Sequence, residues 1–236
     1  MGLKESGLRG SLRNVSVGID AIPDSGNLYA DYDPAQLDIS DGDDVTTWEC
    51  QINSDNDLQA DTGNPTYRED EINGHPVLDF DGDRMVVSEE DFGTINQPFT
   101  IYSVVKHESS GRGGVWDKAD RTTDDSSFFR FEGVNDTYDI SFSNFTTGGT
   151  YDGEFAIVGI RADGSNSRLI DRDDEKIADD VGGQELVGHS VGEREDSEEY
   201  LDGPFARHLV YDSGHDNETM SDVMSFLADE YAISLE

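Results

Sequence analysis

The residues of this sequence that could do chemistry are above all carboxylates, because Asp and Glu make up 53 of its 236 residues. Hydrolysis of a glycosidic bond needs two carboxyl groups, one to donate a proton and one to attack the sugar or activate water, roughly 5 to 10 Å apart. The acidic run from Glu193 to Glu198 comes nearest to such a pair. It lacks the strand register that would set two carboxylates side by side, and it is typical of a solvated acidic loop.

The sequence contains no motif for thiol chemistry, metal binding or phosphate binding. Cys50 is the only cysteine, so the chain can form neither an intrachain disulfide nor a thiol-built zinc or redox site. There is no phosphate-binding Gly-Lys-Ser/Thr loop. A net charge of -37 repels phosphate backbones, so nucleic acid is not an expected partner. The histidines, which show no metal-ligand spacing, are His75, His107, His189, His208 and His215.

Calcium is the one cofactor that the sequence suggests. The stretch from Asp79 to Asp83, followed by Glu90, nearly satisfies the first, third, fifth and twelfth positions of a calcium loop. The glycine that such a loop needs at its sixth position is replaced by Arg84. A polar β-turn between two strands is the interpretation that the residues favour. If a metal binds, Asp81 and Asp83 are the candidate ligands.

Aromatic residues near turns suggest a sugar platform, in which a ring stacks on a pyranose and a polar neighbour binds its hydroxyls. Trp116, with Asp117 beside it, follows a glycine-rich turn, and Tyr151 and Tyr200 lie in predicted loops. These four residues are the candidate carbohydrate-binding residues. Trp116 fits equally well as a core residue of its own strand, whereas the two tyrosines are expected to be exposed.

The elements that must position these residues are short strands. Apolar and polar residues alternate with period two, for example from Tyr138 to Ser143, and Phe99 to Lys106 is apolar on both faces, as in a central strand. The only convincing helix is the last element, with an apolar stripe from Met220 to Tyr231 and Ser221 as its cap. Further strands are expected at 76–80, 85–88, 114–117, 127–131, 155–161, 168–172, 186–191 and 205–211, separated by turn clusters. Strands and turns at this density predict an all-β sandwich of the jelly-roll type.

The composition indicates a folded protein adapted to salt. Its hydrophobic residues amount to 34% and occur in strand-like runs, so a core can form despite the acidity. Only four of the 16 basic residues are lysines, and this depletion together with the acid excess is typical of halophiles. No run of about 18 apolar residues is present, and the start of the chain lacks the apolar region of a secretory signal. We therefore expect a protein that spans no membrane and is not secreted by that route.

Several strings together resemble the laminin G-like, concanavalin A-like jelly rolls. They begin with the opening strands at 28–33 and 37–48 and continue with Ile72-Asn73-Gly74-His75-Pro76 leading to Asp79-Phe80-Asp81-Gly82. The strand at 99–105, the turn at 162–166, the stretch 201–206 and the closing helix follow in the family's order, so the match covers residues 28–235. The resemblance implies a concanavalin A-like sandwich. Its glucanase members carry Glu-x-Asp-x-Glu on a catalytic strand, and this string is absent here, so no enzyme is expected.

The first 27 residues fall outside that resemblance and form a predicted docking arm. Residues 1–19 carry a charge of +2, against -39 for the rest of the chain. A basic arm on an acidic protein indicates docking onto an acidic partner, although a chance fluctuation is the simpler alternative. The stretch from Gly7 to Val17 is similar to leaders on structural proteins of haloarchaeal tailed viruses. The residues expected to dock are Lys4, Leu8, Arg9, Leu12 and Arg13.

These observations support three hypotheses about function. The first is a virion structural protein of a haloarchaeal virus, held to other virion proteins by its arm, assembled in the host cytoplasm, with a lectin-like domain that decorates the particle or binds host glycans. Such a protein is expected to form a homo-oligomer. The second is a carbohydrate-binding module or glycoside hydrolase-related protein of a haloarchaeon. The third is a structural capsid or tail component without a ligand.

The acidity predicts that low salt destabilises the fold. At about 1 M salt the Debye length is about 3 Å, so repulsion among the surface carboxylates is screened, and dilution removes this screening. We expect the melting temperature, followed by circular dichroism, to fall on dialysis from molar to millimolar salt. A melting temperature that stays constant over that range would contradict salt adaptation.

Overall fold

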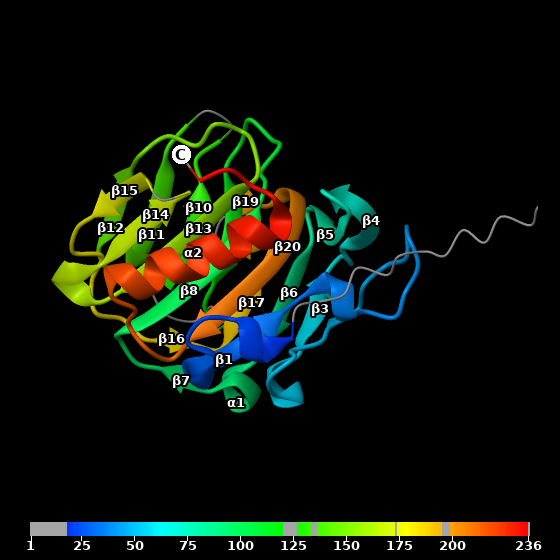
Figure 1. Cartoon of the computed structure of the whole chain (residues 1–236), viewed down its shortest axis with the longest axis horizontal. Coiled ribbons are helices and arrows are strands. Elements are labelled where there is room, and N and C mark those ends of the chain that lie inside the picture. The colour runs from blue at the N-terminus through cyan, green and yellow to red at the C-terminus, as the bar shows by residue number, and fades with distance from the viewer. Residues whose placement is uncertain (1–17, 120–126, 134–135, 173, 195–198, 236) are drawn as a thin grey trace, which may run out of the picture.

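The computed structural model describes residues 18–119, 127–133, 136–172, 174–194 and 199–235. Two antiparallel sheets lie face to face, and the longer helix crosses the outside of one of them (Figure 1). The predicted all-β sandwich with a short C-terminal helix is therefore confirmed. None of the helices in the described residues is long and apolar enough to span a membrane.

Sheet A carries the helix on its outer face. Its central strands are β13, β8, β20 and β5, and β1 pairs with β20 beside the main path. In spatial order the strands are β15 (Asp174–Ala178), β14 (Arg168–Asp171), β13 (Ala156–Ala162), β8 (Phe99–Val105), β20 (Asp202–Tyr211), β5 (His75–Asp81) and β4 (Thr66–Ile72), with β1 (Leu28–Tyr32) attached.

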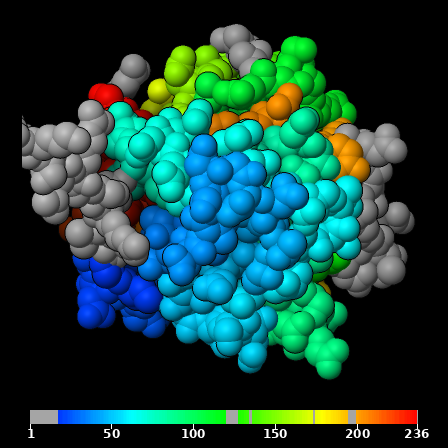
Figure 2. All heavy atoms as spheres, turned by 90° about the vertical axis from the view of Figure 1, so that its right-hand side faces the viewer, coloured from blue at the N-terminus to red at the C-terminus, as the bar shows by residue number. Residues whose placement is uncertain are grey.

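Sheet B is the opposite layer, and α2 does not cross it. In spatial order its strands are β12 (Phe145–Gly148), β11 (Tyr138–Phe142), β10 (Ser127–Phe131), β9 (Gly113–Asp117), β17 (His189–Val191), β6 (Arg84–Val87), β3 (Leu58–Thr62) and β2 (Thr47–Trp48). Two short strands, β18 (Glu193–Arg194) and β19 (Glu199–Tyr200), pair with each other, and β19 also pairs with β9. Figure 2 looks onto the end of the molecule where β3 and β4 lie. There the chain between β1 and β6, blue to cyan, forms one continuous surface.

Short elements complete the chain. A separate two-stranded sheet joins β7 (Thr94–Ile95) to β16 (Leu186–Val187). The one-turn helix α1 (Glu89–Phe92) precedes β7, and the 3-10 turns are η1 (Ile19–Ala21), η2 (Ser25–Asn27), η3 (Pro34–Gln36), η4 (Ser54–Asn56) and η5 (Gly164–Asn166).

The alternation of residue types explains why each strand lies where it does. In β8, Phe99, Ile101 and Val105 point between the sheets, whereas Tyr102 and Val104 point toward α2. This confirms the predicted central strand with two apolar faces. In β10, Phe129 and Phe131 join the core between the sheets, so Phe128 and Arg130, which alternate with them, face outward.

The predicted strand over 186–191 is broken at Gly188. This glycine has a positive φ of 59°, and a side chain there would lie 3.0 Å from the Glu89 nitrogen and 3.1 Å from the Val87 oxygen. The chain therefore turns at this point, and β16 and β17 join different sheets.

Helix α2 (Asn217–Tyr231) begins one turn earlier than predicted. Asp216 caps it by accepting a hydrogen bond from the Thr219 N–H at 2.9 Å, so the prediction of Ser221 as the cap is wrong. A carboxylate is a good cap because it also interacts favourably with the helix dipole. The apolar stripe is as predicted, and it packs on sheet A through Met220, Val223, Met224, Leu227 and Tyr231.

The described part of the predicted arm, residues 18–27, packs onto the sandwich. Ile22 is buried in the cluster beneath α2, and the Tyr211 hydroxyl donates to the Pro23 carbonyl at 3.0 Å. Asp24 lies 3.2 Å from a ring nitrogen of His215. The candidate docking residues Lys4, Leu8, Arg9, Leu12 and Arg13 all lie outside the described residues.

Arg207 on β20 anchors the first strand and the last helix to sheet A. Its guanidinium donates to Asp31 at 2.8 and 2.9 Å, to Asp33 at 2.9 Å and to Glu230 at 3.3 Å, and all four side chains are buried. Burial raises the pKa of Glu230 to about 7, against the lowering effect of Arg207. This carboxyl therefore carries part of a proton at neutral pH.

Two histidines connect the sheets at the centre of the core. His189 on β17 and His208 on β20 approach through their Nε2 atoms at 2.7 Å, and the His208 Nδ1 lies 3.0 Å from the Ser103 hydroxyl. Their rings are stacked, with centroids 4.9 Å apart. Burial lowers the pKa of His189 to about 3 and that of His208 well below its ordinary value, so both are neutral.

The buried pair predicts a loss of stability in acid. Between the ordinary histidine pKa of 6.5 and the folded value of about 3, the unfolded chain binds protons that the folded pair excludes, so falling pH favours unfolding. Glu230 titrates in the opposite sense, because its raised pKa adds stability as the pH falls through about 7. The measurable quantity is therefore the difference between wild type and variant. We expect His189→Gln to reduce the histidine contribution by about 1.4 kcal/mol per pH unit between pH 6.5 and 5.

Urea unfolding at fixed salt measures this slope. His75→Gln, at a partly exposed histidine on β5, serves as the control and is expected to change the slope less. Equal slopes for wild type and His189→Gln would contradict the neutral buried pair.

Candidate functional site

The outer face of sheet B brings aromatic and charged side chains together near its β12 edge. On β10 to β12 the register places Arg130 opposite Asp139 and Asp139 opposite Thr147. The adjacent row runs from Phe128 through Ser141 to Phe145. We call Phe128, Arg130, Asp139, Phe145 and Thr147 the Arg130 face. Side chains directly opposite across antiparallel strands lie about 5 Å apart, so the two rows form one continuous surface.

Phe145 gives this face an exposed aromatic ring. Its side chain is 55% exposed, more than any other large hydrophobic residue in the described part of the chain, where Ile52 follows at 37%. Its ring centroid lies 6.1 Å from that of Phe128, and the Arg130 guanidinium carbon lies 5.5 and 5.4 Å from the two rings. A guanidinium within about 6 Å of an aromatic ring is attracted by the electron density of that ring. The exposed ring is therefore held in place from beneath.

Arg130 is the centre of an ion-pair network. It donates to Asp139 at 2.8 and 3.0 Å, to Glu132 at 2.6 Å and to Glu199 at 2.5 Å. The half-exposed Arg112 donates to the same two glutamates, at 2.9 and 3.1 Å. The Thr147 hydroxyl completes the network by donating to Asp139 at 2.6 Å. Arg130 thus uses all three of its guanidinium nitrogens to hold carboxylates in fixed positions.

Two carboxyl groups of the network take up a proton in mildly acidic solution. Burial, followed by a hydrogen bond with Glu132, raises the pKa of Asp139 to about 6. Although burial raises the pKa of Glu132 as well, its hydrogen bonds with Asp139 and Arg112 lower it overall. The two carboxyls therefore share one proton below about pH 6. Asp139 is buried, so the acceptors that a hydroxyl-rich ligand can reach beside the aromatic ring are the Glu132 and Glu199 carboxylates, whose side chains are 19% and 11% exposed.

The four predicted carbohydrate-binding residues do not assemble into one site. Trp116 is fully buried opposite Phe129, in the core between the sheets, so it is the core residue of its strand. The prediction that Tyr151 is exposed is wrong, because its ring packs 4.3 Å from Phe131 and its hydroxyl accepts from the His107 N–H at 2.9 Å. A ring in the core cannot stack on a sugar.

The other two predicted residues lie near the Arg130 face. Asp117 is buried and accepts a hydrogen bond from the Lys118 N–H at 2.7 Å. Tyr200 is partly exposed and pairs with Gly114, which itself lies opposite Arg130. Tyr200 therefore extends the row that runs from Thr147 through Asp139 to Arg130.

The candidate calcium ligands form a turn. The Asp83 carboxylate accepts from the Asp81 N–H at 2.9 Å, in the link between β5 and β6. This geometry is that of a polar turn, in which an Asp side chain bonds to nearby backbone. No group of three or more His, Cys, Asp or Glu suited to a metal forms in the residues that the structure describes. Asp81 and Asp83 therefore do not fit a calcium cage.

Sequence reasoning missed Arg130, Asp139 and Phe145. A signal was present, because Arg130 is the only charged residue in an otherwise aromatic strand, Phe128-Phe129-Arg130-Phe131. An arginine at such a position needs an acidic partner on the neighbouring strand. Strand pairing identifies this partner as Asp139, but pairing between strands is not visible in one sequence.

Comparison with known proteins defines the fold. No family model and no curated protein matches the sequence. Among solved structures, the chain is similar to Trypanosoma rangeli sialidase, with a TM-score of 0.61 at 11% identity over 87% of this chain and 33% of that one. Domain 4 of AbnA, a GH43 extracellular arabinanase from Geobacillus stearothermophilus solved in complex with arabinotriose, matches with a TM-score of 0.58 at 11% identity over 84% and 98% of the two chains.

A third similar structure is the receptor binding domain of botulinum neurotoxin C/D mosaic serotype, with a TM-score of 0.59 at 10% identity over 85% of this chain and 51% of that one. The chain spans about a third of the length of the sialidases that it matches. The protein thus shares the antiparallel β-sandwich fold of these structures. More narrowly, it has the concanavalin A-like fold that the resemblance predicts.

The network makes Arg130 far more important for stability than its partner Arg112. We expect Arg130→Met to destabilise the fold by about 3 to 5 kcal/mol, because it leaves carboxylates buried without their cation. Arg112→Met, at an exposed end of the same network, is expected to cost at most about 1 kcal/mol. Urea unfolding at fixed salt and pH 7.5 measures both, and equal losses would contradict this assignment of the network's centre.

Proposed function

We propose that the protein is a non-catalytic carbohydrate-binding domain that holds glycan on the Arg130 face. The observation that carries this proposal is the exposed Phe145 ring beside a row of fixed polar groups. Sites for small ligands combine apolar or aromatic surface with a few well-placed polar groups, and this face has both. The ring offers a stacking surface for a sugar, and the row that contains Asp139 and the Thr147 hydroxyl lies beside the row of the ring.

The fold adds support to this proposal. One similar structure, domain 4 of AbnA, was solved in complex with arabinotriose, and the chain covers nearly all of that domain. Sheet B also leaves its outer face uncrossed by α2 (Figure 1), and on the Arg130 face Phe145 and Thr147 are exposed, whereas Phe128, Arg130 and Asp139 lie buried beneath them. Strands lie about 4.8 Å apart, so the rows across β12, β11, β10 and β9 span roughly 14 Å.

The raised pKa of Asp139 brings a hydrolase into consideration, because a carboxylic acid that is protonated near neutral pH can act as a general acid. Its surroundings favour a structural role. Asp139 is buried, donors from Arg130 and Thr147 occupy it, and its proton lies toward Glu132. We therefore propose binding without hydrolysis. Release of reducing sugar from a bound polysaccharide would contradict this part of the proposal.

The assignment to a haloarchaeal virion is a separate and narrower hypothesis. It rests on the basic arm, and residues 1–17 of that arm lie outside the described residues. A lectin-like domain on a particle surface and a free carbohydrate-binding module would use the Arg130 face in the same way. Particle location, host origin and homo-oligomer formation stay predictions. Co-purification with virions, lost on deletion of residues 1–17, would support the viral hypothesis.

Phe145 provides the test of the proposed site. We expect Phe145→Ala to weaken binding to an insoluble polysaccharide at least tenfold, because the stacking surface is lost, while the fold is kept because the ring is exposed. Pull-down against a panel of polysaccharides in molar salt measures the bound fraction.

Ile52→Ala is the matched control. Ile52 is the other exposed large hydrophobic residue of the described chain, and it lies between β2 and η4 at the far end of sheet B. Its removal is expected to leave binding unchanged. Equal losses in the two variants would indicate non-specific hydrophobic adsorption and would contradict the proposed site.

A further inference from the structure

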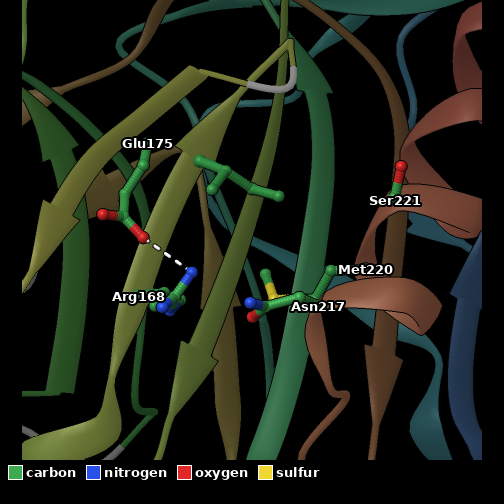
Figure 3. A pocket seen from close by; sticks show the side chains of 6 residues that line it. Arg168, Glu175, Asn217, Met220 and Ser221 are labelled. Carbon is green, nitrogen blue, oxygen red and sulfur yellow. Dashed lines mark ion pairs between the residues drawn. The ribbon is translucent and has the colours of Figure 1, made fainter.

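A hollow on the other side of the sandwich has the composition of a second ligand site. It has a volume of about 270 Å³ and lies between the first turns of α2 and the β14–β15 hairpin at the edge of sheet A. Figure 3 shows Arg168 and Glu175 on the strand side and Asn217, Met220 and Ser221 on the helix side. Neither the carboxylate network nor the aromatic rings of the Arg130 face contribute to it.

The alternation of side chains along β14 explains why these residues lie on the outer surface of sheet A. Leu169 and Asp171 point inward, where Leu169 joins the core and Asp171 accepts a hydrogen bond from the Tyr138 hydroxyl. Arg168 and Ile170 therefore point outward, toward the helix. A bulge between Leu169 and Ile170 sets Glu175 opposite Ile170. The guanidinium and the carboxylate then meet at 2.7 Å along one wall.

The hollow combines an apolar floor with polar walls. Met220 is buried and Ile170 is half buried, and both belong to the apolar layer between α2 and sheet A. Around them stand a guanidinium, a carboxylate, a primary amide and a hydroxyl, which supply both donors and acceptors. An apolar base with a few polar groups converging above it is the usual design of a small-molecule site.

The charges around the hollow limit the class of ligand that it can bind. Arg168 and Glu175 neutralise each other, so the walls carry no net charge. An anion would have to displace Glu175 from the guanidinium, and it would approach a molecule of net charge -37. A cation would find a single carboxylate that is already paired. A neutral polyhydroxylated ligand meets neither obstacle, because its hydroxyls both donate and accept and its C–H faces match Met220 and Ile170.

We propose that this hollow binds one sugar unit of a neutral glycan, as a second site on the face opposite the Arg130 face. The inference extends the proposed function, because it takes the same class of ligand. A volume of about 270 Å³ lies just below the usual range of roughly 300 to 1,000 Å³ for small-ligand sites, so the hollow takes a single unit or a chain end. The two sites lie on the outer faces of different sheets. One molecule can therefore bind two glycan chains at once and gain avidity when both are engaged.

The test uses the full chain in molar salt. Arabinotriose, maltotriose, cellotriose and chitotriose serve as probes in saturation-transfer NMR and calorimetry. Ser221→Trp fills the hollow from an exposed position on α2, and Asp222→Trp sets the same ring one residue further along the helix as the control. Phe145→Ala removes the other site. Circular dichroism confirms that each variant is folded.

We expect wild type to bind at least one probe at two sites, and Ser221→Trp to abolish one of them while Asp222→Trp keeps both. Beads are coated with the polysaccharide that wild type binds in the pull-down. Their cross-linking by the protein is expected to fall at least tenfold in each single-site variant. If binding is unchanged in Ser221→Trp and is lost in Phe145→Ala, the second site is wrong and the proposed function stands. If only Ser221→Trp loses binding, the hollow stands and the Arg130 face is wrong. Failure of wild type to bind any probe overturns both.

Discussion

The fold is organised around arginines that are buried together with carboxylates. The chain has 16 basic residues against 53 acidic ones, yet Arg207, Arg130 and Arg84 are almost fully removed from solvent. Each holds carboxylates from different parts of the chain. Arg207 joins β1 and α2 to β20, Arg130 joins β11 and β19 to β10, and Arg84 on β6 lies 2.5 Å from Asp61 and 3.7 Å from Glu193. A guanidinium suits this role because its planar set of donors serves several carboxylates at once.

This arrangement links stability to the proposed binding surface. The same guanidinium that neutralises Asp139 and Glu132 also lies against the Phe128 and Phe145 rings. The exposed ring is therefore placed by contacts within the sheet and needs no ligand to order it. A surface that is already in position loses little conformational entropy on binding. The hollow beside α2 has a similar basis, since its two charged side chains hold each other in place.

The sandwich could be predicted from the sequence because the alternation of apolar and polar residues shows which side of a strand is buried. The strand over 127–131 and the apolar stripe of α2 follow directly from that rule. Alternation does not show which strands pair, so the meeting of Arg130 with Asp139 could not be foreseen. It left Trp116 undecided between core and surface and did not reveal that Tyr151 is buried, because a ring near a turn is buried or exposed according to the sheet packed over it. The cap of α2 was misplaced because Ser and Asp are both good caps and only the packing of the first turn selects Asp216.

For the histidine pair between the sheets, one arrangement of the ring protons leaves no buried N–H group without an acceptor. Within the described part of the chain the His189 Nδ1 has no hydrogen-bond partner, so placing a proton there would leave a buried donor unsatisfied. The proton therefore sits on the His189 Nε2, which donates to the His208 Nε2, and the His208 Nδ1 then donates to the Ser103 oxygen. Each imidazole carries a single N–H that points at a group on the other sheet or on a neighbouring strand. These two protons exchange with water only when the two sheets separate. The exchange rate of their NMR resonances therefore reports how often the sandwich opens.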